Sequence, residues 1–419
     1  MTSPRPRGNT DQLPAADRAA VERERIRFVL ALGRALHRYG TPAHRLEEAL
    51  GIVCRQLGLE AEVLSTPTFL TVRFGEPSEL RTSMMRVDPP ELDLAKLAKL
   101  DSLADAVSDR EIDPLVGLEQ IAAIEKAPRV WGVVPETITS ALTPASVAVF
   151  FGGSGRDVAA AAAVGLVIGV LALVTKARAH AARAFELLGA FVAAFGAGAI
   201  AGMVSGVHPS IVTIAALIAL LPGMTLTTAM TELATRNLVS GTARLMAALV
   251  ILLELGLGVA LGERLAAELF VIDPGAPVPL PAWSVWLAFF VSALGMVVVC
   301  QAERAATGWI LLASLVGFAG AQQGTELLGG QLGVLVGAFA LGIFANLYAR
   351  GLDRPQQVVL VPAMILLVPG SLGFRGISSL LDRDTLTGIE TTFAMFVVAM
   401  AIVAGLLIAN AAVSPRRVM

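Results

Sequence analysis

The sequence predicts an α-helical polytopic membrane protein with about ten transmembrane helices, arranged as a 5+5 inverted repeat, and an N-terminal cytoplasmic α+β domain. Three observations support this fold class. Hydrophobic residues make up 55% of the 419 residues and charged residues only 16%, a more apolar balance than soluble proteins have. The charges gather before residue 130, and two Pro-Gly pairs recur 147 residues apart in the apolar part.

Composition also excludes several classes of protein. The net charge is −2, which does not suit a polycationic nucleic-acid binder. The two cysteines, Cys54 and Cys300, are far apart and predict neither a disulfide framework nor a zinc site. Residues 1–20 are polar and proline-rich, unlike a signal peptide, and we expect a disordered tail that is not translocated.

The distribution of charge predicts the domain boundaries. Residues 1–130 hold 38 of the 66 charged side chains, and the remaining 289 residues hold 28. A change of solvent near Arg129 explains this difference, because charged side chains are costly inside a bilayer. The predicted parts are a tail (1–20), a cytoplasmic α+β domain (21–130), transmembrane repeat 1 (131–262), a linker loop (263–282) and transmembrane repeat 2 (283–413).

The N-terminal domain alternates helix and strand patterns. Residues 17–39 have apolar side chains at helical spacing and end at Gly40, and a second helix follows from Pro42 to Leu57. Three β-prone runs and two further helical segments complete an α+β module: 60–66, 68–74, 81–87, 91–108 and 114–126.

The second helix of this domain begins with the motif "HRLEE". His44 shares a helix face with Glu47 or Glu48, which is half of a metal site. The domain offers no second pair, so we expect a solvated or salt-bridged helix start and no metal. Arg45 and Glu47 are the residues we expect to transmit a gating effect from this domain to the membrane part.

Hydropathy and helix breakers give ten candidate spans. Their ranges are 135–152, 157–175, 185–206, 208–224, 240–262, 283–302, 307–323, 330–350, 355–373 and 388–411. With a shift of 147 residues, Leu221-Pro222-Gly223 overlays Val368-Pro369-Gly370, Gly241 overlays Gly388, and Gly258 overlays Gly405. Matched markers in matched span order indicate a duplication of five spans.

An odd number of spans per repeat makes the second repeat enter the membrane from the other side. The halves are then related by a pseudo-two-fold axis in the membrane plane, as in secondary transporters. The positive-inside rule places both termini in the cytoplasm, since most Lys and Arg residues between spans then lie inside. Arg156, Arg264, Arg375 and Arg383 lie outside in this topology.

The two Pro-Gly breaks are the candidate substrate site, because broken helices expose backbone groups and half-helix termini to a ligand. The candidate residues after the first break are Pro222, Gly223, Thr225, Thr228, Glu232 and Arg244. Those after the second break are Pro369, Gly370, Ser371 and Arg375. An arginine suits a carboxylate and a glutamate suits an ammonium group, so a small amino acid fits this set.

Two acids are candidates for proton coupling. Glu254 lies in the middle of a span, where it is either a neutral hydrogen-bonded carboxyl or a proton carrier, and Glu232 follows the first break. His208 precedes Pro209 at the start of a span, and we interpret it as structural or interfacial.

The stretch "LPGMTLTTAMTELATRNLVSGTAR" resembles the first membrane signature of the threonine/serine exporter family. That signature is Pro-Gly, an acidic residue ten positions after the proline, and Gly-x-x-Arg, here Pro222, Gly223, Glu232, Gly241 and Arg244. The family often has aspartate where this chain has Glu232. The second signature, Pro-Gly and aromatic-Arg-Gly, is similar to Pro369, Gly370, Phe374, Arg375 and Gly376. The soluble-domain pattern Gly-x-x-x-x-Arg-x-Glu is similar to Gly40, Arg45 and Glu47.

The resemblance implies a non-enzymatic exporter of L-threonine and L-serine in a bacterial inner membrane, driven by the proton motive force. Its partners are then the amino-acid substrate, protons and membrane lipids, without nucleic acid or cofactor, and with homo-oligomers left open. Two alternatives remain at this point. One is a dicarboxylate exporter on the same scaffold. The other is a membrane-anchored hydrolase or sensor acting through the N-terminal domain.

Overall fold

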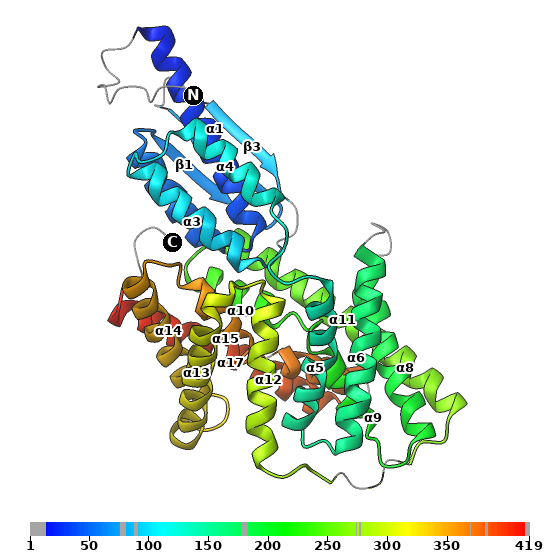
Figure 1. Cartoon of the computed structure of the whole chain (residues 1–419). Coiled ribbons are helices and arrows are strands. Elements are labelled where there is room, and N and C mark those ends of the chain that lie inside the picture. Colours follow the sequence, from blue (N-terminus) through cyan, green and yellow to red (C-terminus); the bar gives the residue numbers. More distant parts are fainter. Residues whose placement is uncertain are drawn as a thin grey trace. The chain divides into compact units, whose positions relative to one another are not determined.

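The computed structural model describes residues 14–75, 81–87, 91–176, 183–273, 275, 278–368, 370–381 and 384–414. The described chain divides into two units: unit 1 runs to Pro128, and unit 2 begins at Arg129 (Figure 1). Each unit is helix-rich, and unit 1 also holds the only sheet among the described residues.

Unit 1 packs four helices with a three-stranded antiparallel sheet of order β1-β2-β3. Its elements are α1 (Ala15–Arg38), α2 (Ala43–Gln56), β1 (Ala61–Ser65), β2 (Phe69–Phe74), β3 (Arg81–Arg86), α3 (Leu94–Ser108) and α4 (Pro114–Lys126). Strand β2 buries every second residue, as expected for a sheet with one face against helices. Gly33 of α1 lies directly against Leu50 of α2 and Leu70 of β2, so one core joins these three elements.

The first helix begins earlier than predicted. A helix was predicted from residue 17 and a disordered tail up to residue 20; α1 begins at Ala15, so residues 15–20 are helical, and residues 1–13 lie outside the described part of the chain. The alanine-rich start with Asp17 in the first turn explains the correction, because alanine favours helix and an acid there complements the helix dipole.

Unit 2 consists of helices that are apolar along most of their length. They are α5 (Val133–Phe150), α6 (Gly155–Lys176), α8 (Phe185–Met203), α9 (Pro209–Leu217), α10 (Gly223–Ala234), α11 (Leu238–Leu269), α12 (Trp283–Val299), α13 (Thr307–Leu328), α14 (Gly333–Leu352), α15 (Gln357–Ile365), α16 (Gly370–Leu381) and α17 (Thr385–Ala412). Within the described residues, eight segments are long and apolar enough to cross a membrane, and α12 is a shorter apolar helix.

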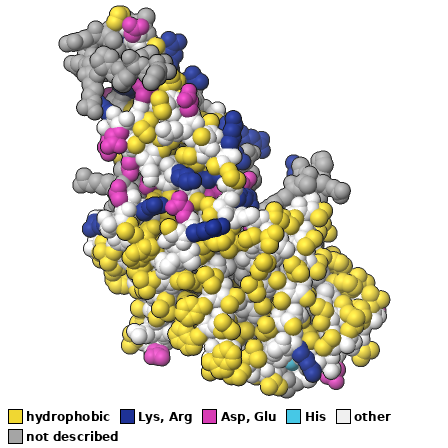
Figure 2. Space-filling view, viewed as in Figure 1, with side chains coloured by type: hydrophobic (Ala, Val, Ile, Leu, Met, Phe, Trp, Pro, Cys, Tyr) yellow, Lys and Arg dark blue, Asp and Glu magenta, His cyan; other side chains and the backbone are white. Residues whose placement is uncertain are grey.

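Figure 2 shows hydrophobic side chains covering the visible face of unit 2, whereas charged side chains are frequent on unit 1. Exposed leucine, valine and phenylalanine side chains are common on the long helices of unit 2. A surface of this kind suits lipid rather than water. The prediction of a polytopic helical membrane protein is therefore confirmed.

Two predicted spans are interrupted, as expected from their Pro-Gly pairs. The segment 208–224 is divided into α9 and the start of α10, and the segment 355–373 into α15 and the start of α16. Pro222 precedes α10 and has no amide hydrogen to continue the helix before it, which explains the first division. The predicted linker 263–282 also needs correction, because α11 continues through Leu269.

The secondary structure follows the 147-residue spacing seen in the sequence. Helices α10 and α16 begin at Gly223 and Gly370, and α11 and α17 begin at Leu238 and Thr385. Packing follows it too: Gly258 lies against the backbone of α8 as Gly405 lies against the backbone of α14. Corresponding elements of the two halves therefore make corresponding contacts.

Candidate functional site

The two helix breaks lie against each other. A Cβ atom placed on Gly223 would lie 3.2 Å from the backbone nitrogen of Gly370, and one placed on Gly370 would lie 3.4 Å from the Cα of Gly223. Helices α10 and α16 both begin at this contact, so two half-helix N-termini meet inside unit 2. Pro369, also predicted for the site, lies outside the described residues.

The acid and base after the first break form an ion pair. The Nε atom of Arg244 donates to both carboxylate oxygens of Glu232, at 3.1 and 3.0 Å. The Glu232 side chain is fully buried and that of Arg244 is 13% exposed. Each residue therefore neutralises the other in this conformation, and neither is open to a substrate. Thr225 and Thr228 lie on the same helix as Glu232, partly buried.

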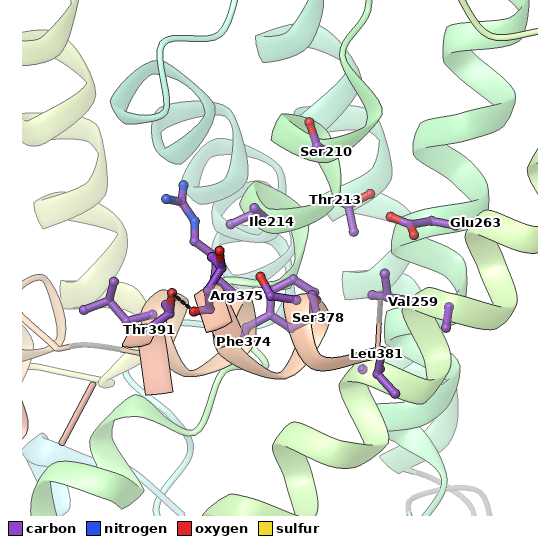
Figure 3. A pocket seen from close by; sticks show the side chains of 15 residues that line it. Ser210, Thr213, Ile214, Val259, Glu263, Phe374, Arg375, Ser378, Leu381 and Thr391 are labelled. Carbon is purple, nitrogen blue, oxygen red and sulfur yellow. Dashed lines mark hydrogen bonds between the residues drawn. The ribbon is translucent and has the colours of Figure 1, made fainter. Parts of the chain in front are cut away.

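A cavity of about 440 Å³ lies among α9, α11, α16 and α17. Arg375 is the predicted substrate-site residue that lines it, and Figure 3 shows its side chain beside the cavity. Gly370 and Ser371 belong to the first turn of α16 and do not line the cavity. Glu254 lies half-buried on α11 but is also absent from the lining.

Arg375 carries a positive charge without a carboxylate partner among the described residues. Its guanidinium lies over the ring of Phe151, 4.7 Å from the ring centroid. A cation–π contact orients the guanidinium while leaving its N–H groups able to donate to a ligand. Arg375 is therefore available to bind an anionic group.

The cavity has polar residues that the sequence analysis missed. Glu263 of α11 lies across the cavity from Arg375 in Figure 3, with Thr213 between them. Hydroxyl groups come from three of the surrounding helices: Ser210 and Thr213 of α9, Ser378 and Ser379 of α16, and Thr387 and Thr391 of α17. Among the described residues, the cavity lining thus includes one cation, one carboxylate and several hydroxyls.

The repeat contained a signal for two of these residues. Ser379 lies 147 residues after Glu232, and Thr391 lies 147 residues after Arg244. The ion pair of the first half therefore corresponds to part of the cavity lining in the second half. Glu263 gave no such signal, because it was placed in a loop instead of on α11.

In unit 1, the candidate gating residues have local roles. The backbone N–H of Ser65 donates to Oε1 of Glu47 at 2.8 Å, which joins α2 to the end of β1. Burial lowers the pKa of the Arg45 guanidinium, an effect that the nearby Glu48 opposes. No group of three His, Cys, Asp or Glu side chains suited to a metal ion occurs in the described part of the chain.

Comparison with known proteins identifies the family. Residues 27–266 match the family model described as "Putative threonine/serine exporter", and residues 285–412 match a second, described as "Threonine/Serine exporter, ThrE". No solved structure matches the chain.

The curated relatives are fungal proteins called pheromone-regulated membrane protein 10. The proteins of Zygosaccharomyces rouxii, Eremothecium gossypii and Saccharomyces cerevisiae are 26%, 27% and 25% identical to this chain. The matched regions cover 86%, 84% and 88% of this chain, respectively. The chain spans 37%, 49% and 49% of their lengths, so each has further sequence of its own. With two family models covering most of its length, the chain belongs to the threonine/serine exporter family of multi-pass membrane proteins.

Proposed function

We propose that this protein is a secondary active transporter that exports small hydroxy amino acids of the threonine and serine class, and that the cavity beside Arg375 binds them. The supporting observation is the cavity itself. It lies among apolar helices and combines Arg375, whose guanidinium has no carboxylate partner among the described residues, with Glu263 and a set of hydroxyls. Its volume is of the order that small-molecule sites have, roughly 300–1,000 Å³.

The chemistry of the lining suits a zwitterion. The guanidinium of Arg375 binds the substrate carboxylate through paired N–H donors. The carboxylate of Glu263 balances the substrate ammonium group from the other side of the cavity. Hydroxyls such as those of Thr213 and Ser378 are within the lining to hydrogen-bond the substrate hydroxyl, which selects against aliphatic amino acids.

A dicarboxylate fits this lining less well. Its second anionic group would meet the carboxylate of Glu263, and like charges in a site of low polarity repel strongly. Succinate is therefore the informative competitor, because it shares the carboxylate that binds Arg375 but lacks the ammonium group.

We further propose an inverted repeat with ten crossings and both termini in the cytoplasm of a bacterial inner membrane. The corresponding contacts of Gly258 and Gly405 and the meeting of Gly223 with Gly370 support the repeat. In that topology the cavity lies on the outer side, where α9 begins and α11 ends. The corresponding inner position is filled by the Glu232–Arg244 ion pair, so this conformation is open outward and closed inward.

Proton coupling completes the proposed activity, because export against a gradient needs an energy source. Glu254 and Glu232 are the acids of the membrane segments that we propose for this role. Glu254 is half-buried on α11 without an ion pair among the described residues, whereas Glu232 is held by Arg244. Unit 1 is then the gating domain, with Arg45 and Glu47 as its candidate residues.

Counterflow in proteoliposomes tests the proposal. Vesicles loaded with unlabelled threonine should accumulate labelled threonine, with serine competing and succinate competing weakly. Arg375→Lys should lower the rate about tenfold or more, since lysine keeps the charge but loses the paired donors. Arg264→Lys is the matched control, because Arg264 is exposed and pairs only with Glu268 within its helix.

Two results would contradict the proposal. Absence of threonine and serine counterflow by folded protein, with or without a pH gradient, would exclude the substrate class. Competition by succinate where threonine does not compete would reassign the cavity to dicarboxylates.

A further inference from the structure

A buried acid–histidine pair lies at the start of α9, outside the residues proposed for substrate or proton binding. Asp157 of α6 is fully buried, and His208, which precedes α9, is 7% exposed. The Nδ1 atom of His208 lies 3.0 Å from Oδ2 of Asp157, and the backbone N–H of His208 donates to Oδ1 at 2.6 Å. Both atoms of the carboxylate are thus engaged with His208.

The remaining contacts of Asp157 fix its charge state. The backbone N–H of Ser154 donates to Oδ2 at 2.7 Å and its hydroxyl donates to the same oxygen at 2.8 Å. A carboxyl group that accepts this many hydrogen bonds is an anion. The anion requires a proton on Nδ1 of His208, so Nε2 of the neutral ring carries a lone pair.

The Nε2 atom of His208 is buried and has no hydrogen-bond partner among the described residues. Buried polar atoms without partners are rare and indicate a functional role or a mobile partner. A proton added at Nε2 would convert the ring to an imidazolium ion beside an anion, which is a charge-balanced pair.

We infer that the Asp157–His208 pair is a further proton-binding site, required for coupling in addition to the acids proposed above, with Nε2 of His208 as the atom that takes and releases the proton. This inference rests on the proposed transport function. The step needs no other reactant: the proton binds the lone pair of Nε2, Asp157 stays ionised, and the net charge of the pair changes from −1 to 0.

The second half of the chain has a counterpart with arginine in place of the histidine. Glu303 and Arg354 lie 146 residues after Asp157 and His208, one residue off the spacing of the repeat, and their side chains pair at 2.8 Å. Both pairs join the beginning of a repeat's second helix to the beginning of its first half-helix. Arginine stays protonated at all physiological pH values and histidine does not. Of the two pairs, the first-half pair therefore holds a base whose ordinary titration range is near neutral pH.

Asp157 contacts His208 directly, and Arg156 is a second, positive charge near it. Helix α9 packs against α5, α6 and α8. On those helices, Glu136 and Glu186 lie at the ends opposite to the start of α9. Arg156 lies at the same end, but its guanidinium donates to the carbonyl of Ser205. The other charges to consider are Arg375 and Glu263 in the cavity.

The pair is connected to the substrate cavity through α9. Ser210 and Thr213 line the cavity and lie two and five residues after His208, on a half-helix of only nine residues. A protonated Nε2 becomes a donor without an acceptor, and it gains one by reaching water or the cavity. Protonation therefore favours a displaced start of α9, which moves one wall of the substrate cavity.

Replacement of His208 should abolish the coupling to the pH gradient while leaving threonine counterflow intact. In His208→Asn the amide nitrogen takes the place of Nδ1 and still donates to Asp157, whereas the titrating atom is lost. In proteoliposomes, this variant should keep threonine counterflow at equal pH within about twofold of the wild type. Accumulation driven by an acidic vesicle lumen, from which protons leave in exchange for threonine, should fall to the level of vesicles without a gradient. A second variant, Asp157→Glu with His208→Arg, recreates the Glu303–Arg354 type of pair. It should likewise keep threonine counterflow and lose pH-driven accumulation.

Glu303→Gln is the matched control, because it removes the acid of the counterpart pair, and its pH-driven accumulation should stay at the wild-type ratio. Retention of pH-driven accumulation in His208→Asn would overturn the inference. Wild-type protein without any threonine or serine counterflow would instead contradict the proposed function.

Direct proton titration tests the pair without a substrate. Between pH 5 and 8 the solubilised wild-type protein should bind one proton more than His208→Asn. Identical titration curves would overturn the inference, whatever the transported substrate proves to be.

Discussion

Gly223 and Gly370, 147 residues apart in sequence, pack backbone to backbone where α10 and α16 begin. A Cβ atom on Gly223 would come within 3.3 Å of the Gly370 Cα and within 2.7 Å of a methyl group of Val368. Backbone atoms cannot rotate away as a flexible side chain can, so a Cβ atom at Gly223 requires the facing backbone to move by a few tenths of an ångström and the Val368 methyl group to turn away. The contact joins the two halves of unit 2 at the point where each half breaks its helix.

Substitution of Gly223 by alanine should therefore destabilise unit 2. We expect a loss of about 1–3 kcal/mol in the free energy of unfolding, the usual cost of overpacking. The measurement is thermal unfolding in detergent. The control is Gly308→Ala, because a Cβ atom at Gly308 meets nothing within 4 Å. That control should be neutral or slightly stabilising, since alanine favours helix. Equal unfolding temperatures for the two variants would show that the breaks do not pack as described.

The Glu232–Arg244 ion pair gives a second prediction. Glu232→Gln leaves the guanidinium of Arg244 buried beside a neutral amide, and breaking a buried pair in this way costs about 3–5 kcal/mol. The double variant Glu232→Gln with Arg244→Gln should be less destabilised than the single one, because it leaves no buried charge. A double-mutant cycle of unfolding free energies measures this coupling. Additive effects of the two changes would mean that the ion pair does not form.

The positions of the two helix breaks could be predicted from the sequence, but the helices on either side of each break could not. Pro222-Gly223 and Gly370 indicated where the helix is interrupted, because proline and glycine act locally. Hydropathy then joined the apolar segments on both sides into single spans, since it measures composition and cannot detect a turn inside an apolar stretch. The result was two predicted spans where the structure has four helices, namely α9, α10, α15 and α16.

The candidate site was predictable only in part. Arg375 was identified because a charge beside a break is unusual, whereas Ser378 and Thr391 look like ordinary helix residues until their contacts are known. The pairing of Asp157 with His208 joins residues 51 positions apart, and hydropathy gives no sign of it. The interpretation of His208 as structural explains its bonds to Asp157 but not its unpartnered Nε2.

Cys54 of α2 gives a prediction about pH in unit 1. Burial raises the pKa of its thiol to about 12, and the residue is 1% exposed. The raised pKa stabilises the folded state fully below the unfolded value, near pH 8.5, and this stabilisation is lost as pH rises toward 12. Maleimide should therefore label Cys54 slowly in native protein at pH 8, with the site identified by mass spectrometry.

Urea-unfolded protein is the control for Cys54, and it should be labelled at the rate of an ordinary thiol. Native labelling at that same rate would show that the thiol is exposed. Labelling that accelerates between pH 9 and 11 only in step with loss of helical circular dichroism would agree with the expected linkage of pH to unfolding.

Glu263 should determine the choice between a zwitterion and a dianion. Glu263→Gln removes the carboxylate that faces Arg375 across the cavity, which leaves the cavity more positive. Threonine counterflow should fall about tenfold, the effect of roughly 1.4 kcal/mol of lost ammonium binding. Succinate should inhibit the variant at lower concentration than it inhibits the wild type, because its second carboxylate no longer meets a like charge.

The matched control for Glu263 is Glu268→Gln on the same helix. Glu268 is exposed, pairs with Arg264 and does not line the cavity. A general loss of negative charge on α11 would affect both variants equally, whereas recognition of the substrate ammonium group would affect only Glu263→Gln. If the two variants have the same threonine rate and the same succinate inhibition, Glu263 does not face the substrate and the cavity recognises its ligand through Arg375 and the hydroxyls.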